Sequence, residues 1–71
     1  MEANEEKMVF SEYMKNLREY QRVDIINDLM KLCLVSRPTV YRWINGKMKP
    51  SSVKRKIIAE YLNISEDRFV I

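Results

Sequence analysis

The sequence predicts an all-α domain, folded as a compact bundle of about five short helices. Apolar residues recur at helical spacing, and no run alternates with the period of two typical of a half-buried strand. Glycine and proline are also scarce, with one and two copies in 71 residues. A chain of this length forms a single domain. We assign residues 8–71 to it and expect residues 1–7 to be a flexible acidic N-terminal segment.

Two helices are predicted in the first half of the chain. Residues 8–20 carry one apolar stripe at helical spacing, and either Asn4 or Ser11 is a suitable N-cap. Residues 24–34 follow, with Asp24 as the predicted N-cap. This second helix is apolar over much of its circumference, so we expect it at the centre of the core.

A third, short helix is predicted over residues 37–44. Ser36 is suited to its N-cap, and Pro38 lies in the first turn, where amide hydrogens have no partner within the helix. Asn45 and Gly46 end this helix, because glycine readily takes the left-handed conformation found at helix C-termini.

A fourth helix begins after Pro50, with Ser51 or Ser52 as its N-cap, and ends near Asn63. Its inward residues are expected to be Val53, Ile57, Ile58, Tyr61 and Leu62. The acidic segment from residue 65 to 67 predicts the start of a last, short helix that carries Phe69.

The join between the second and third helices is very short. The apolar pattern of the second ends at Leu34 or Val35, and Ser36 already begins the third. A turn of three or four residues forces a steep crossing and makes the later helix protrude. Because Val40 and Trp43 take the inward face, the outward face is expected to present Arg37, Pro38, Tyr41, Arg42 and Asn45.

A protruding helix, about 10–12 Å across, fits the ~12 Å major groove of B-DNA. The planar fork of an arginine can meet O6 and N7 of guanine together, so Arg37 and Arg42 are candidate base readers. Tyr41 can reach a phosphate or lie against a thymine methyl group.

Charge is segregated along the chain. Residues 36–56 contain seven cations and no carboxylate, although the net charge of the whole chain is only +3. Ordinary surface mixes both signs, so this block indicates a footprint for a polyanion; the alternative is chance clustering that aids solubility. Lys54, Arg55 and Lys56 lie near the start of the fourth helix, where each cation costs about 0.3–1 kcal/mol at low salt. Phosphate binding explains that placement; the alternative is solvent exposure, with Lys56 paired to Glu60.

Composition argues against several other classes of protein. Histidine is absent, the one glycine rules out a Gly-rich phosphate loop, and the one cysteine fits a reducing compartment. No apolar run approaches the ~18 residues of a membrane span. We expect a cytoplasmic protein with no catalytic residues, cofactor, metal, small-molecule substrate or membrane partner. Trp43 and Cys33 are interpreted as core residues.

The stretch from Leu29 to Phe69 resembles the lambda-repressor-like (Cro/cI, XRE) helix-turn-helix family. The matching elements are Val35-Ser36-Arg37, Thr39-Val40-Tyr41-Arg42-Trp43, Asn45-Gly46-Lys47 and Lys49-Pro50-Ser51, with Ala59, Leu62 and Ile64-Ser65 at the expected offsets. The chain departs from the family at three positions. Met30 stands where the family usually has a small residue, Leu34 where it usually has a glycine in the turn, and Ile26 where a phosphate-binding glutamine is common. The resemblance implies a five-helix DNA-binding domain.

The expected function is sequence-specific binding of double-stranded DNA by a transcriptional regulator, through a recognition helix at about residues 36–45. Groove contacts are expected from Ser36, Arg37, Pro38, Thr39, Tyr41 and Arg42, and phosphate contacts from Asn45, Lys47, Lys49, Lys54, Arg55 and Lys56. Two alternatives stay open: a protein-interaction module, either antitoxin-like or a recombination accessory factor, and a non-specific architectural or RNA-binding domain.

A small module binds DNA weakly alone, so we expect a homodimer that spans half-sites about 34 Å apart. The apolar residues Phe69, Val70 and Ile71 are the candidate dimer contact, or they cover the core of their own domain.

Overall fold

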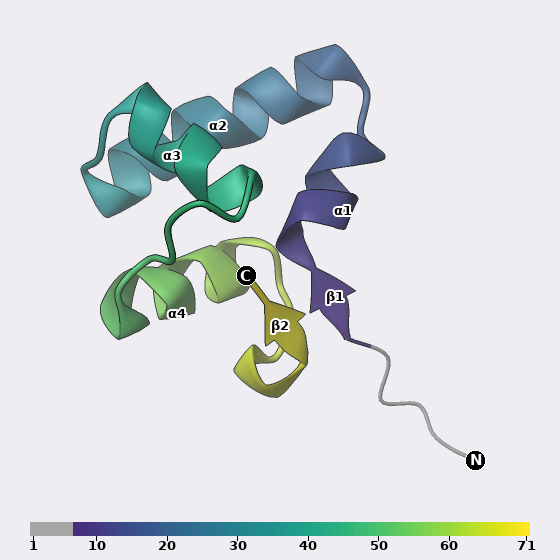
Figure 1. The fold of residues 1–71 in the computed structure, drawn as a ribbon, viewed down its shortest axis with the longest axis vertical. Coiled ribbons are helices and arrows are strands. Elements are labelled where there is room, and N and C mark those ends of the chain that lie inside the picture. The colour runs from purple at the N-terminus through teal and green to yellow at the C-terminus, as the bar shows by residue number, and fades with distance from the viewer. Residues whose placement is uncertain (1–6) are drawn as a thin grey trace.

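The computed structural model describes residues 7–71 (Figure 1). Asn4 and most of the predicted acidic N-terminal segment lie outside this range. The elements run in the order β1 (Met8–Val9), α1 (Phe10–Lys15), α2 (Glu19–Cys33), α3 (Arg37–Ile44), α4 (Ser52–Tyr61), η1 (Glu66–Arg68) and β2 (Phe69–Val70). The long helix α2 packs against both α3 and α4. The mostly helical fold is confirmed, with four α-helices in the described range and not five.

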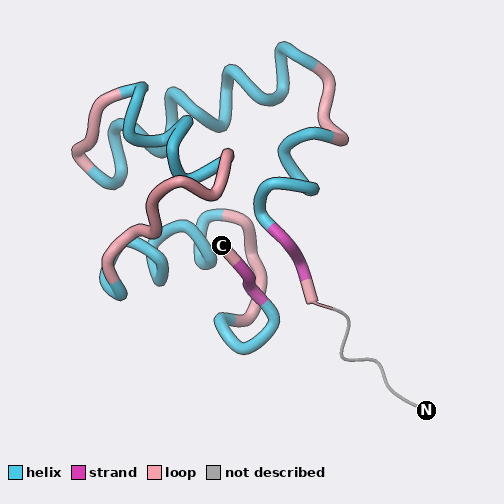
Figure 2. Tube along the Cα trace, viewed as in Figure 1, coloured by secondary structure: helices cyan, strands magenta, loops and turns pink. Residues whose placement is uncertain are grey.

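The expectation that no strands form is wrong for the two ends of the domain. β1 and β2 pair in parallel, with Met8 opposite Phe69 and Val9 opposite Val70 (Figure 2). Strands of two residues are too short to show an alternating pattern, so the sequence carries no signal for them. The predicted last helix is only the single 3-10 turn η1, and Phe69 follows it in β2.

The boundary between the first two helices also differs from the prediction. α1 ends at Lys15, and α2 begins at Glu19 and not after Asp24. The N-cap of α1 is Val9, and the alternative Ser11 lies inside the helix. The apolar stripe keeps helical spacing across the break, so periodicity does not locate it.

Side-chain contacts explain where this corner falls. The backbone N–H of Arg18 donates to Oε1 of Gln21 at 3.0 Å, which closes the start of α2. The guanidinium of Arg22 donates to the carbonyl oxygens of Met14 and Leu17, both at 3.1 Å, and so satisfies the end of α1.

The core lies where α2, α3 and α4 meet α1 and the strand pair. Its buried residues are Phe10, Met14, Ile26, Leu29, Cys33, Val40, Trp43, Ile44, Ile58, Ala59 and Phe69. The interpretation of Trp43 and Cys33 as core residues is therefore confirmed. Val53 was expected to face inward but is 68% exposed, because α4 turns Ile58 and Ala59 toward the core and not its first turn.

One hydrogen bond joins α4 to α2 across the core edge. The Tyr61 hydroxyl donates to Oδ2 of Asp28 at 2.5 Å. Burial, this hydrogen bond and the negative charge of Asp28 together raise the pKa of Tyr61 from 10.0 to about 12. The phenol is therefore neutral at physiological pH and fastens α4 to α2.

Candidate nucleic-acid interface

The turn between α2 and α3 contains only residues 34–36. Leu34 ends α2 in the left-handed conformation, at φ 57° and ψ 49°, and its N–H donates to the carbonyl of Met30. The N–H of Val35 donates to the same carbonyl at 3.1 Å. A left-handed residue is required at this corner, which explains why glycine is usual there in the family that the sequence resembles. Leucine meets that requirement at a conformational cost, and its side chain is 88% exposed.

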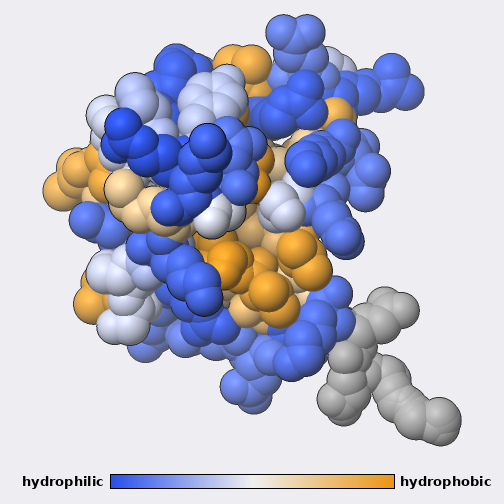
Figure 3. Space-filling view, in the orientation of Figure 1, coloured by the Kyte–Doolittle hydropathy of each residue, from blue (hydrophilic) through white to orange (hydrophobic). Residues whose placement is uncertain are grey.

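The orientation predicted for α3 is confirmed. Val40, Trp43 and Ile44 are buried, so one face of this short helix is anchored in the core. Within the described range the Nε1 of Trp43 has no hydrogen-bond partner, which indicates that the ring is held by apolar packing. The opposite face is exposed and consists of Arg37, Pro38, Tyr41, Arg42 and Asn45. In Figure 1, α3 lies in front of α2, and in Figure 3 hydrophilic side chains cover it.

The two arginines of α3 differ in their surroundings. The Arg37 guanidinium donates to Oδ1 of Asn27 on α2, at 3.0 Å. Arg42 is exposed, and no hydrogen bond or ion pair involves its side chain within residues 7–71. Neither arginine forms an ion pair with a carboxylate of the described chain, so both keep their full positive charge at the surface.

The remaining groove candidates lie at the start of α3. Ser36 is the N-cap residue by its backbone conformation, and its hydroxyl hydrogen-bonds the Thr39 hydroxyl at 3.1 Å instead of a backbone amide. Pro38 lies in the first turn, as predicted. Asn45 is the C-cap, and Gly46 follows with a φ of 75°, which also agrees with the prediction.

The basic segment continues from α3 into the start of α4. Lys47, Lys49 and Lys56 are exposed, and Lys54 is half-buried. Ser51 is the N-cap of α4, and its hydroxyl accepts the backbone N–H of Lys54 at 3.3 Å. The first turn of α4 contains no acidic residue. Four lysines thus lie within a few residues of the N-terminus of α4, on the segment that follows α3.

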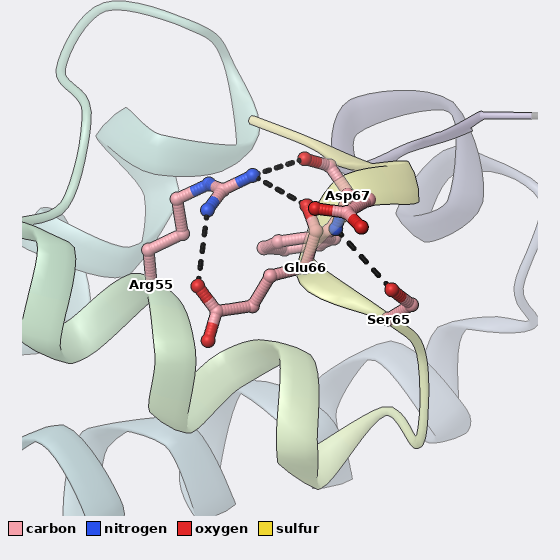
Figure 4. A network of polar contacts seen from close by, with 5 residues as sticks. Arg55, Ser65, Glu66 and Asp67 are labelled. Carbon is pink, nitrogen blue, oxygen red and sulfur yellow. Dashed lines mark hydrogen bonds and ion pairs between the residues drawn. The ribbon is translucent and has the colours of Figure 1, made fainter.

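Arg55 departs from this pattern, because its guanidinium points toward the C-terminal segment (Figure 4). It donates to the carbonyl oxygens of Glu66 and Phe69, both at 2.7 Å. It also forms an ion pair with the Glu66 carboxylate at 3.4 Å and lies 5.8 Å from the centre of the Phe69 ring. These contacts use three of the five N–H donors of the guanidinium and hold it at the C-terminal segment. We therefore expect a structural role for Arg55 and leave it out of the phosphate contacts proposed below.

A family model with the description helix-turn-helix, of the Cro/cI (XRE) type, matches residues 14–69. The chain belongs to this family. The match spans α3, the basic segment that follows it and the C-terminal turn. Comparisons with curated proteins and with solved structures gave no significant match.

Members of the Cro/cI helix-turn-helix family are DNA-binding regulatory domains and are not typically enzymes. Within residues 7–71, no cluster of three or more cysteine, aspartate or glutamate side chains is arranged to hold a metal ion. None of the described helices is long and apolar enough to cross a membrane.

The departures from the family are accommodated in the fold. Ile26, where a phosphate-binding glutamine is common, is fully buried and contributes to the core. Met30 is half-buried and packs against that core. Asn27, next to Ile26, is the polar residue of α2 that contacts α3, and sequence analysis missed it. Its only sequence signal is that Asn27 and Asp28 form a polar pair between the apolar residues Ile26 and Leu29.

Proposed function

We propose that this protein is a sequence-specific regulator of transcription that binds double-stranded DNA by inserting α3 into the major groove. The observation that carries the proposal is the two-sided character of α3. One face is anchored in the core by Val40, Trp43 and Ile44. The other face is exposed and carries Arg37 and Arg42, whose positive charges are not paired with a carboxylate of the described chain. A rigid, cationic face with planar donors suits base edges in the major groove.

The contacting residues divide into two groups with different effects. Arg37 and Arg42 are proposed to read bases, and the residues that assist them in the groove are Ser36, Pro38, Thr39 and Tyr41. Phosphates are proposed to be held by Asn45, Lys47, Lys49, Lys54 and Lys56. Phosphate contacts position the protein without selecting a sequence, whereas base contacts select it.

The test begins with the selection of duplexes from a random pool by the purified protein. Arg37→Ala and Arg42→Ala should each weaken binding to the selected duplex by about 1–3 kcal/mol and relax the preference at one base pair. Lys54→Ala should weaken binding to all duplexes about equally and lower the slope of log K against log salt by about one. Equal losses on selected and random DNA for all three variants would refute this division and favour the non-specific alternative.

A homodimer is part of the proposal. Phe69 covers the core of its own domain and is only 2% exposed, so the dimer contact is restricted to the residues after it. Val70 is 38% exposed, beside the half-buried Ile71 and, on β1, Val9. Figure 3 shows an apolar patch over the paired strands. Two copies joined through this patch would present two recognition helices to half-sites about 34 Å apart.

Sedimentation velocity over a range of concentrations tests the dimer. Val70→Lys should shift the protein toward monomer, whereas Val53→Lys, which changes a more exposed valine on α4, should leave the distribution unchanged. A wild-type protein that stays monomeric, both free and on a palindromic duplex, would rule the dimer out.

The exposed apolar residues of α2 do not favour a protein-interaction module over this proposal. Tyr20 and Val23 lie near one end of α2, and Leu32 and Leu34 lie at the other. Single exposed apolar side chains are common on protein surfaces, whereas a docking site needs a continuous patch. We therefore propose no second function.

A further inference from the structure

Asn27 is the one α2 side chain that hydrogen-bonds a side chain of α3 within residues 7–71. It lies between Ile26 and Asp28, and Ile26 and Leu29 are fully buried on either side of it along the helix. The backbone of Asn27 is therefore fixed by the core. Its half-buried side chain extends from this fixed point, and its Oδ1 accepts the Arg37 guanidinium at 3.0 Å.

We propose that Asn27 is a positioning residue that holds the Arg37 guanidinium in the orientation needed to read a base. This inference rests on the proposed function. Arginine loses considerable side-chain entropy when it binds, and a side chain already held in its bound conformation loses less. The contact to Asn27 thus supplies part of the ordering before DNA arrives.

The chemistry of asparagine suits this role. Its amide oxygen is a neutral acceptor and takes one of the five N–H donors of the guanidinium, so the others stay available for guanine O6 and N7. An aspartate at the same position would form an ion pair and reduce the positive charge that faces DNA. Position 27 therefore orders Arg37 without neutralising it.

Arg42 provides the internal comparison. It lies on the same exposed face of α3, but its side chain has no hydrogen bond or ion pair within residues 7–71. If Asn27 acts through Arg37 alone, the two arginines differ in mobility in the free protein. They also differ in their response to a substitution at position 27.

The first experiment needs no DNA. ¹⁵N relaxation of the arginine Nε–H groups should show a more restricted side chain at Arg37 than at Arg42 in the wild-type protein. In Asn27→Ala the order parameter of Arg37 should fall to that of Arg42. Equal order parameters in the wild-type protein would overturn the inference, whether or not the protein binds DNA specifically.

The second experiment uses the selected duplex. Asn27→Ala should weaken binding about three- to tenfold and reduce the preference at the base pair read by Arg37, with the preference at the Arg42 base pair unchanged. In an Arg37→Ala background, Asn27→Ala should have no further effect. Thermal unfolding of each variant separates these effects from a loss of folding.

The outcomes distinguish the two proposals. If Arg37→Ala removes the base preference and Asn27→Ala leaves it intact, the positioning role is wrong and the proposed function stands. If the wild-type protein binds all duplexes alike, the proposed function fails, and the relaxation measurement still decides whether Asn27 orders Arg37.

Discussion

Replacing Arg55 with alanine distinguishes a structural cation from the neighbouring cations that are proposed to bind DNA. The substitution removes two hydrogen bonds from a charged donor to backbone carbonyls, those of Glu66 and Phe69. The Arg55 side chain is one-third exposed, so we assign each bond about 1 kcal/mol, below the ~1.5–3 kcal/mol typical of charged hydrogen bonds. The exposed ion pair and the contact with the Phe69 ring each add about 0.5 kcal/mol or less.

The sum predicts a loss of about 2–3 kcal/mol in the free energy of unfolding for Arg55→Ala. For a domain of this size each kcal/mol lowers the melting temperature by roughly 4–8 °C, so a decrease of roughly 10–20 °C is expected. Thermal unfolding followed by circular dichroism at 222 nm measures it, and urea unfolding gives the free energy independently.

Lys54→Ala is the matched control for this experiment. It removes a cation from the adjacent position, near the positive end of the α4 dipole, and should leave stability unchanged or raise it by about 0.3–1 kcal/mol. The effect of Lys54→Ala should instead be a lower affinity for DNA. If Arg55→Ala has the melting temperature of the wild-type protein but loses DNA affinity as Lys54→Ala does, the structural assignment of Arg55 is wrong.

Two further predictions concern the turn and the link between α2 and α4. Leu34→Gly should raise the free energy of unfolding by about 0.5–1 kcal/mol, because it relieves a left-handed leucine whose side chain is 88% exposed. A urea midpoint at or below that of the wild type would contradict this. Since the pKa of Tyr61 is raised to about 12, the stabilisation by its neutral phenol is complete below pH 10 and is lost as the pH rises through 12. Alkaline unfolding should therefore be less pH-dependent in Tyr61→Phe, and an unchanged profile would count against the bond to Asp28.

Local signals predicted α3 and its surroundings well. Ser36, Pro38 and Gly46 mark the two ends of this helix, and the spacing of Val40 and Trp43 sets its inward face. Each of these signals depends on residues within one or two helical turns, so it can be recognised in the sequence before any tertiary contact is known. The same holds for Ser51 at the start of α4.

The errors fall where distant segments meet. The break between α1 and α2 depends on Arg22 reaching back to the end of α1, and the apolar stripe continues across it. β1 and β2 are each two residues long and exist because the two ends of the domain lie side by side. Charge alone also gave no sign of the contacts that Arg55 makes with Glu66 and Phe69, which lie 11 and 14 residues away.

The amino-acid order alone was sufficient to predict the bounds of α3, its inward face and the acid-free block of cations around it, because capping, periodicity and charge are properties of neighbouring residues. Which cations remain available to a ligand was settled by folding. Arg42 is left free within the described chain, Arg37 is held by Asn27, and Arg55 is bonded to the C-terminal segment. The sequence gives the sign of the charge on each side chain but not the direction in which the side chain points. That direction depends on hydrogen-bond and ion-pair partners that only the tertiary structure brings close.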